Sequence, residues 1–414
     1  MTISDPLRAF AEKLPFGWQL KSFEAMLAEP VRNGIYKTKE FHGRGARVVN
    51  MGELFSFDFI SGQEMKRVEL TPDEENKTGL VDGDLLFARR SLVLEGAGKC
   101  ALVVNPPDTM TFESSIIRAR PNRRVAEPRF LFYLFASPLG RAIIASIATR
   151  TAVSGIRGSD LSQVGLPLPP LSVQRRIAGI LSAYDELIEN NQRRIKILES
   201  MARALYCEWF VHFRFPGHEK VPLVASPLGE IPQGWEVKRL DEVLELKYGK
   251  ALKKEDRRDG PFPVYGSSGM VGTHESSLVK GPGIIVGRKG NVGSIFWCND
   301  DFFVIDTAYF VTSSLPLRFL FYVLPTLNFI NSDAAVPGLS RNQAYTLEIL
   351  VPPTKLLTMF CELVNTFEGK PPHSNAKSKT SAGRATCYCR VCCRGKLHST
   401  ERQHEFHRQP VFRC

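Results

Sequence analysis

The sequence predicts an α/β (α+β) protein of two similar globular domains separated by long helices. Four phrases of the first half recur in the second half in the same order, one long amphipathic segment lies between the halves, and each half mixes strand-like with helix-like runs. A chain of 414 residues is long enough for two or three domains that each bury a core.

The repeat covers most of each half. Leu14–Lys21 returns as Ile231–Lys238, Arg129–Tyr133 as Arg318–Tyr322, Thr151–Ile156 as Ala334–Leu339, and Pro169-Pro170 as Pro352-Pro353. A period near half the chain indicates duplication of a whole domain and not a solenoid. Two related domains in one chain suggest a target with two parts.

The first domain is predicted over residues 1–170. Runs rich in valine, leucine and phenylalanine, Asp84–Ala88 and Cys100–Val104, predict strands. Apolar residues at helical spacing over Pro128–Ile147 predict a helix or a pair of helices.

A long helix is predicted next, over residues 171–215. Its apolar or small residues alternate at spacings of four and three, and we call this set the seam: Ile177, Leu181, Tyr184, Ile188, Asn191, Ile195, Leu198, Ala202 and Leu205. Such a seam predicts a partner helix. Asn191 within the seam either fixes the register of that pairing at a cost in stability or simply faces solvent.

The second domain is predicted over residues 216–353. It is rich in glycine and strand-like runs, notably Pro263–Gly269 and Gly283–Gly293. A shorter helix is predicted over residues 354–370, directly after Pro352-Pro353, as the long helix follows Pro169-Pro170. The repeat therefore predicts that this shorter helix is the partner of the long one.

Charge alone does not require a nucleic-acid partner. The net charge is +11, but residues 365–414 carry ten Lys and Arg against three Asp and Glu, so residues 1–364 hold only +4. The first 20 residues lack the apolar stretch of a secretion signal, and no run approaches the roughly 18 apolar residues of a membrane span. We expect a cytoplasmic protein with no membrane partner.

Several phrases carry a resemblance to a known family. Pro169–Ile177 and Met201–Tyr206 resemble the central conserved helix of type I restriction-modification specificity (S) subunits. Gly229–Trp235 resembles the start of a target recognition domain of that family, and Val264–Gly269 and Ile285–Gly290 are similar to other family phrases. The resemblance covers residues 14 to 367, and its specificity comes from the ordered combination.

The resemblance implies a function as well as a fold. Residues 1–170 and 216–353 would be two target recognition domains, each reading half of a split sequence in double-stranded DNA through the major groove. The two conserved helices would pair as an antiparallel coiled coil that sets the spacing. The chain would have no catalytic activity or cofactor of its own. It would bind two methyltransferase (M) subunits and, through them, restriction (R) subunits, which carry S-adenosylmethionine, ATP and magnesium.

The tail, residues 371–414, departs from the family. A Leu-rich end is expected where the chain reads Arg384–Leu397, and codons for the Leu-rich phrase read one base out of register can give this cysteine-rich run. Pro371-Pro372 also stops a helix where the family continues one. The sequence therefore predicts a frameshift near residues 366–372 and a disordered tail. The alternative is a zinc site, although the spacing fits one poorly; its candidate ligands are Cys387, Cys389, Cys392, Cys393, His398, His404 and His407.

Basic residues after strand-like runs are the candidate DNA contacts. Arg89-Arg90 and Arg288-Lys289 occupy matching parts of the two domains, and Asn291 follows the second pair. Arg and Lys suit guanine edges or phosphates, and Asn suits adenine. Further candidates are two arginines near the repeated glycines and three residues of a Gly-flanked phrase: Arg157, Arg341, Tyr265, Ser267 and Ser268. For each of them, an ordinary solvated loop is the competing interpretation.

Two alternatives come from other classes of protein. The first is a methyltransferase with fused recognition domains, but Asn105–Asp108 lacks the aromatic residue of that enzyme motif. Gly96–Lys99 has valine at position 93 where a phosphate-binding loop needs glycine, so a connection between strands is predicted there. The second alternative is a coiled-coil adaptor that binds only proteins, which retention on DNA would distinguish.

Overall fold

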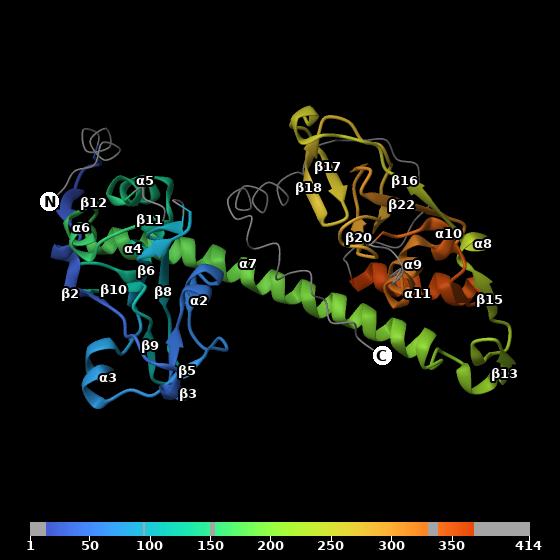
Figure 1. Cartoon of the computed structure of the whole chain (residues 1–414), viewed down its shortest axis with the longest axis horizontal. Coiled ribbons are helices and arrows are strands. Elements are labelled where there is room, and N and C mark those ends of the chain that lie inside the picture. The colour runs from blue at the N-terminus through green and yellow to red at the C-terminus, as the bar shows by residue number, and fades with distance from the viewer. Residues whose placement is uncertain (1–13, 94–95, 150–153, 330–337, 368–414) are drawn as a thin grey trace. The chain divides into compact units, whose positions relative to one another are not determined.

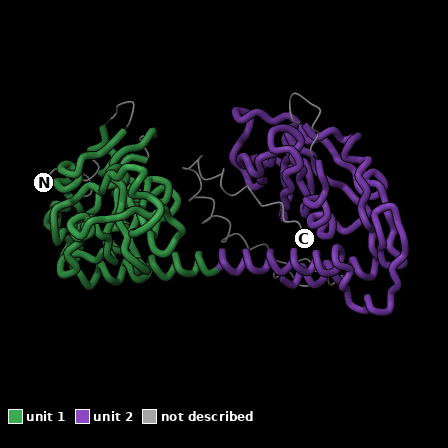
Figure 2. Tube along the Cα trace, turned by 60° about the horizontal axis from the view of Figure 1, so that its bottom comes forward, with its two compact units in different colours: residues 1–190 green, residues 191–414 purple. Residues whose placement is uncertain are grey.

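The computed structural model describes residues 14–93, 96–149, 154–329 and 338–367. The chain divides into two compact units, residues 1–190 and 191–414 (Figure 2), and each is described by itself. Both units mix strands and helices (Figure 1), which confirms the predicted α/β class. The divisions predicted at residues 170, 215, 353 and 370 stay predictions. The tail, with its cysteines and histidines, lies outside the described residues.

Unit 1 begins with three strands and ends on the long helix. Its elements are β1 (Gln19–Ser22), β2 (Leu27–Asn33), β3 (His42–Val49), α2 (Met51–Ser56), β4 (Phe59–Ile60), β5 (Arg67–Val68), α3 (Pro72–Thr78), β6 (Leu85–Ala88), β7 (Arg90–Ser91), β8 (Cys100–Val103), β9 (Met110–Phe112), β10 (Ile116–Pro121), α4 (Pro128–Ala136), α5 (Pro138–Ile147), β11 (Ser154–Gly155), α6 (Gly158–Gln163), β12 (Gly165–Leu168) and the first part of α7 (Leu171–Tyr206).

Unit 2 begins within α7 and ends on a shorter helix. After α7 come β13 (Leu223–Ser226), β14 (Gly229–Pro232), β15 (Glu236–Arg239), α8 (Leu240–Val243), β16 (Leu244–Tyr248), β17 (Phe262–Gly266), β18 (Gly269–His274), β19 (Gly283–Gly287), β20 (Ile295–Cys298), β21 (Phe303–Val304), β22 (Ala308–Ser313), α9 (Leu317–Val323), α10 (Arg341–Tyr345), β23 (Glu348–Val351) and α11 (Thr354–Phe367).

The two units repeat one topology. The main sheet has the order β2-β10-β6-β8-β4 in unit 1 and β16-β22-β19-β20 in unit 2. A smaller sheet follows the same pattern, β5-β3-β9 in one unit and β18-β17-β21 in the other. The repeated first phrase forms β1 and β15, which pair antiparallel with β12 and β23, the strands just before α7 and α11. The first duplicated phrase therefore occupies equivalent places in two copies of one fold.

The predicted elements of unit 1 appear where the sequence indicates them. The buried runs 85–88 and 100–103 are neighbouring central strands, β6 and β8. The predicted helix pair forms α4 and α5, which are bent by 77° at their junction. Proline at the first turn of each helix suits the break, because its ring fixes a helical φ and needs no hydrogen-bond acceptor. The apolar faces of both helices enter the core around Phe87 and Phe135.

Two of the described cysteines are core residues. Cys100 and Cys298 are buried free thiols that pack as small apolar side chains. Among the described residues no single helix is long and apolar enough to cross a membrane, although α4 and α5 taken together meet the criteria of length and composition.

Helix α7 is 36 residues long, which corresponds to about 54 Å at 1.5 Å per residue. Gln174 fixes its start: the buried side-chain amide donates to the carbonyls of Pro169 and Val125, and its oxygen accepts the backbone N–H of Glu127. Most of the seam is open beyond this point, with Tyr184 63% and Ile195 54% exposed. The helix therefore keeps a large apolar surface uncovered by the described residues.

The end of α7 lies in the core of unit 2. Ala202 and Tyr206 are buried, and the Tyr206 ring lies 6.4 Å from that of Phe360 in α11. Phe360 also packs against Trp209 and Phe210, in the wider helical turn that ends α7. This end of the seam is thus covered by α11.

Candidate nucleic-acid interface

The best-defined candidate site is built around Arg89 and Arg288, which occupy equivalent backbone positions. Each follows a buried strand by one residue, β6 in unit 1 and β19 in unit 2. The N–H of Arg89 donates to the carbonyl of Ser115 at 2.9 Å, and that of Arg288 donates to Thr307 at 2.9 Å. Equivalent neighbouring strands therefore hold the two arginines in place.

The repeated glycine phrase forms backbone hydrogen bonds to each arginine. The carbonyl of Arg89 accepts the N–H of Ile156 at 3.0 Å, and that of Arg288 accepts the N–H of Leu339 at 2.9 Å. Arg90 pairs with Gly155, and Lys289 bridges to Gly338. The structure thus brings together, within each unit, two sequence signals that were independent: the basic pair and the repeated glycine.

Arg157 and Arg341 are close to these contacts along the chain. Arg157 is the residue before α6, and Arg341 is the first residue of α10, so each follows its repeated glycine by two or three positions. Arg157 is exposed and Arg341 is partly exposed. Their elements then lead to β12 and β23, the strands that precede the conserved helices.

None of these basic residues is neutralised by a carboxylate in the described ranges. Arg89, Arg90, Arg157, Arg288, Lys289 and Arg341 form no ion pair there. By contrast, arginines elsewhere in unit 1 are paired: Arg44 with Glu69, Arg47 and Arg67 with Asp108, and Arg123 with Asp82. The unpaired set retains its charge for an external anion, as binding to phosphate requires.

Three other predicted residues of unit 2 lie at one loop contact. The Asn291 amide donates to the Ser268 hydroxyl at 3.3 Å, and the Ser294 hydroxyl donates to the carbonyl of Ser267 at 2.6 Å. The Ser267 N–H also donates to Thr307, whose carbonyl receives the N–H of Arg288. The turn after β17 and the loop after β19 are therefore joined, which places Ser267, Ser268 and Asn291 near Arg288.

Tyr265 has a different setting. Its ring packs against Phe302 at 6.1 Å and Phe296 at 6.5 Å, on the edge of a small core cluster. The aromatic contacts account for this side chain without a nucleic acid. A role of Tyr265 in DNA contact stays a prediction.

Sequence reasoning missed one aromatic residue of this region, Tyr248, the last residue of β16. The guanidinium carbon of Arg288 lies 4.8 Å from the centre of its ring, and that of Arg341 lies 5.1 Å from it. Nothing in the local sequence signals this contact, because it depends on strand pairing between β16, β22 and β19. Beside Tyr248, burial raises the pKa of Tyr309 to about 12, so its hydroxyl is neutral at physiological pH.

The two enzyme-like phrases have structural roles. Gly96–Lys99 connects β7 to β8, as predicted, and Gly98 has a φ of 65° that favours glycine. Gly293, with a φ of 73°, occupies the matching place before β20 in unit 2. In the loop between β8 and β9, the Asp108 carboxylate binds Arg47 and Arg67.

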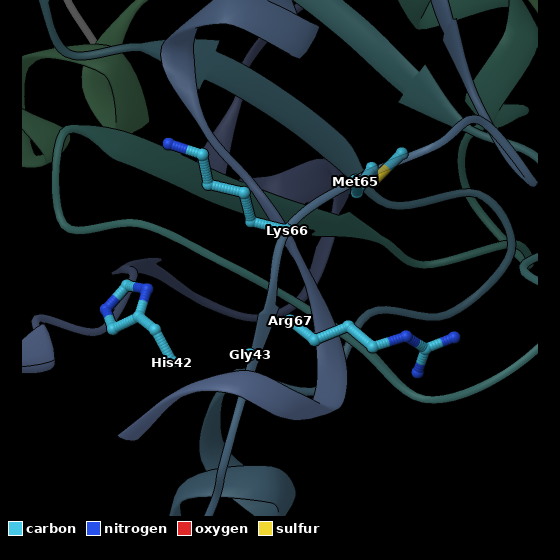
Figure 3. Close-up of a pocket in the computed structure, with 5 residues that line it drawn as sticks. All are labelled: His42, Gly43, Met65, Lys66 and Arg67. Carbon is cyan, nitrogen blue, oxygen red and sulfur yellow. The ribbon is translucent and has the colours of Figure 1, made fainter. Parts of the chain in front are cut away.

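A surface cavity of about 410 Å³ in unit 1 is lined by His42, Gly43, Met65, Lys66 and Arg67 (Figure 3). The side chains of Lys66 and Arg67 extend in opposite directions (Figure 3), and the Arg67 guanidinium is held by Asp108 and the carbonyl of Gly45. The polar groups that line the cavity do not converge on one point, and none of the predicted DNA-contact residues lines the cavity. Among the described residues no cluster of His, Cys, Asp or Glu is arranged to hold a metal ion.

Two copies of one α/β fold, each with uncompensated cations at the same sheet position, are the features expected of a two-domain nucleic-acid recognition protein. Comparison with known proteins identifies its family. The model of the type I restriction modification DNA specificity domain matches residues 32–200 and 232–355. These matches cover more than half of the chain, so the chain belongs to this family.

Individual relatives agree with this assignment. The putative type I restriction enzyme MjaX specificity subunit of Methanocaldococcus jannaschii is 25% identical over 381 residues, 82% of this chain and 84% of the relative. The MjaIX specificity subunit of the same organism is 29% identical over 242 residues, 57% of this chain and 54% of the relative. The fold resembles a crystal structure of the type I S subunit from M. genitalium, with a TM-score of 0.52, 18% identity, and 85% of this chain and 91% of that chain covered.

Family membership confirms the function implied by the resemblance, DNA recognition as a type I specificity subunit. It favours neither the fused methyltransferase nor the adaptor. It supports the prediction that the chain is a recognition subunit and not itself the enzyme.

Proposed function

We propose that the chain binds a bipartite sequence in double-stranded DNA, with one half-site for each unit. The observation that carries the proposal is the equivalent placement of Arg89 and Arg288, each with a second basic residue beside it and no described carboxylate to neutralise it. Arg90 and Lys289 are exposed, as contact with a phosphate or base edge requires. Arg157, Arg341, Ser267, Ser268 and Asn291 extend the proposed contact surface.

Helix α7 is the proposed spacer between the half-sites. It is a continuous helix with residues in both units, and neither Pro nor Gly interrupts it after Gly179. A rigid rod converts a fixed number of residues into a fixed number of base pairs between half-sites. Pairing of the long and short conserved helices as an antiparallel coiled coil would stiffen the rod, and the Tyr206–Phe360 contact supports that pairing at one end.

The partners of the chain belong to the same proposal. Two methyltransferase subunits would bind the chain, and restriction subunits would join through them in the cytoplasm. S-adenosylmethionine, ATP and magnesium would reside on those partners and not on this chain. The exposed apolar residues of α7, such as Tyr184 and Ile195, supply surface that an assembly can bury.

The tail decides whether this chain assembles fully. We propose that residues from about 370 onward are read out of frame, as the replacement of the Leu-rich end by a cysteine-rich run indicates. Such a tail would lack the apolar residues needed to cover the seam from Ile188 toward Ala202. The zinc alternative rests on residues outside the described part of the chain.

Alanine variants test the proposed contacts. The full chain, assembled with the methyltransferase subunits of its own genome, is compared as wild type, Arg89→Ala/Arg90→Ala and Arg288→Ala/Lys289→Ala. We expect each pair to weaken binding to the target duplex about tenfold or more and to reduce the slope of log K against log salt by about one for each phosphate that is no longer bound. A loss of discrimination confined to one half-site would identify base contacts.

Matched controls come from arginines that the structure shows in ion pairs. Arg123→Ala and Arg239→Ala each remove an exposed guanidinium bound to Asp82 or Asp241, one in each unit. These variants should bind DNA as the wild type does. Unchanged binding by both test pairs, or equal losses in tests and controls, would contradict the proposed interface.

A further inference from the structure

The two proposed DNA-contact arginines of unit 2 share one aromatic ring. Arg288 comes from the end of β19 and Arg341 from the start of α10, more than fifty residues later in the chain. Their guanidinium carbons lie 4.8 and 5.1 Å from the centre of the Tyr248 ring. Because both distances end on the same point, the two cations can be no farther apart than the sum of those distances.

Two further rings contact the same two guanidinium groups. Tyr309 lies 5.7 Å from the Arg288 guanidinium, and Tyr345 lies 5.9 Å from that of Arg341. We call the five residues Tyr309, Arg288, Tyr248, Arg341 and Tyr345 the tyrosine–arginine ladder. The Tyr248 and Tyr309 rings also contact each other, with centres 5.0 Å apart, so Arg288 lies against a pair of touching rings and Arg341 lies against Tyr248 and Tyr345.

The outer rings of the ladder are anchored to the backbone. The Tyr309 hydroxyl donates to the carbonyl of Leu339 at 3.1 Å. The Tyr345 hydroxyl accepts the N–H of Leu246, on the same strand as Tyr248, at 2.9 Å. Tyr248 is 47% exposed, and within the described residues its contacts are with the Tyr309 ring at 5.0 Å and with the two arginines. An exposed tyrosine that contacts two unneutralised arginines contributes mainly by holding those arginines.

Holding two like charges beside one another costs free energy unless an anion binds between or near them. The Arg288 guanidinium donates to the carbonyl of Asp306 at 3.2 Å and also interacts with the neutral Tyr309 hydroxyl, and Arg341 has its ring contacts. An arrangement of this kind suits an electron-rich group with several acceptor oxygens or nitrogens. In DNA that chemistry is a backbone phosphate or the guanine edge.

The described part of unit 1 lacks the ladder at the matching positions. Tyr248 pairs with Tyr309, and Tyr309 pairs with Val286, two residues before Arg288. In unit 1 the same relations link Asn33 to Ile117 and Ile117 to Phe87, two residues before Arg89. Asn33 and Ile117 therefore replace the two tyrosines. The Arg89 guanidinium retains the carbonyl contact, to Ser114 at 3.5 Å, without an aromatic support.

We propose that Tyr248 is a positioning residue that holds Arg288 and Arg341 as one two-cation site for a phosphate or a guanine edge of the second half-site. The inference rests on the proposed function, since it specifies how unit 2 contacts DNA. It also makes the two domains unequal: unit 2 presents a pair of cations held on aromatic rings, and in the described part of unit 1 Arg89 is held by the Ser114 carbonyl alone. Preordering lowers the entropic cost of each contact.

The test compares Tyr248→Leu, which removes the ring, with Tyr248→Phe, which keeps it. Binding of the full chain, with its methyltransferase subunits, to a fluorescent duplex carrying the methylated target is measured by anisotropy at several salt concentrations. We expect Tyr248→Leu to weaken binding about tenfold and Tyr248→Phe to restore it to within about threefold. Asn33→Ala, the matched control in unit 1, should bind as the wild type does.

Combining Tyr248→Leu with the arginine variant distinguishes a positioning role of the ring from direct contact with DNA and from a loss of stability. When Arg288→Ala/Arg341→Ala is already present, adding Tyr248→Leu should cause no further loss of affinity, because the ring acts through the two arginines. The melting temperature should be unchanged, since Tyr248 is half exposed. If Tyr248→Leu lowers the slope of log K against log salt by about one and leaves the base preference unchanged, the two cations bind a phosphate. If the variant instead reduces the preference for one G·C pair, they bind a guanine edge. Both outcomes support the proposal.

Several results would overturn it. Equal binding by Tyr248→Leu and wild type, while Arg288→Ala/Arg341→Ala binds weakly, would refute the positioning role and leave the proposed function standing. A tenfold loss that adds fully to the loss of the arginine variant would show that the ring contacts DNA independently. Wild-type binding by the arginine variant itself would refute the proposed interface of unit 2 instead.

Discussion

Replacing Phe360 with alanine removes the side chain that joins α11 to the end of α7. Phe360 is fully buried, and its ring centre lies 4.9 Å from that of Phe210, 5.7 Å from Tyr322, 6.3 Å from Trp209 and 6.4 Å from Tyr206. Truncation of a buried phenylalanine costs about 3–5 kcal/mol, because apolar burial is reduced and a cavity is left behind. With four aromatic neighbours, we expect a cost of about 4 kcal/mol for unit 2.

A loss of this size is large against the roughly 5–15 kcal/mol that stabilises an ordinary domain. For a domain of this size it corresponds to a fall in melting temperature of roughly 8–16 °C. Differential scanning calorimetry of the full chain measures it, and the transition of unit 1 should stay in place because Phe360 belongs to the core of unit 2. The control is Leu363→Ala on the same helix, where the side chain is 39% exposed and the expected cost is below about 1 kcal/mol.

The reasoning would be refuted by a Phe360→Ala variant that loses less than about 1 kcal/mol of stability, or no more than Leu363→Ala loses. Either result would mean that α11 is not docked on the end of α7, and the proposed pairing of the two conserved helices would lose its structural support.

Three further predictions concern the spacer, alkaline pH and the tail. Inserting four residues after Asn191 adds roughly 6 Å and about one helical turn, so methylome sequencing should show a changed gap between unchanged half-sequences; altered bases inside a half-site with the same gap would argue against the spacer. Burial raises the pKa of Tyr206 to about 12, so the folded state favours the neutral phenol. The stability that this raised pKa gives the folded state is fully present below the ordinary pKa of about 10. It is lost as the pH rises toward 12, at roughly 1.4 kcal/mol per pKa unit. Calorimetry of Tyr206→Phe should show a smaller fall in the stability of unit 2 over that range than the wild type shows, and identical falls would count against the prediction. Restoring the Leu-rich reading frame after residue 366 should raise the melting temperature and recover binding to methyltransferase subunits, as measured by co-purification; a metal-bound, protease-resistant native tail with no gain on restoration would favour zinc instead.

The sequence predicted the architecture well because the repeat constrains both halves at once. Arg129–Tyr133 and Arg318–Tyr322 belong to α4 and α9, and the two proline pairs stand directly before α7 and α11. Runs of apolar residues in the sequence were sufficient to predict the strands β6, β8 and β19. What the repeat could not supply was the strand order, because pairing between β2 and β10 or between β16 and β22 joins segments more than fifty residues apart.

The candidate site was predictable only in part, for the same reason. Charged residues after buried strands identified Arg89 and Arg288, and the repeated glycines identified their neighbours. Tyr248 gave no signal, because its significance depends on two arginines from β19 and α10 that reach it through the folded sheet. Tyr265 was proposed as a DNA contact because it belongs to a Gly-flanked phrase, but its ring packs on Phe302 within the protein.

Methylome sequencing of cells that express this chain with its methyltransferase subunits tests the central claim most directly. We predict methylation at two short specific sequences separated by a nonspecific gap of fixed length, with Arg288→Ala/Lys289→Ala relaxing one half-sequence and Arg89→Ala/Arg90→Ala the other. A single uninterrupted motif, or a methylation pattern that does not depend on this chain, would contradict the account.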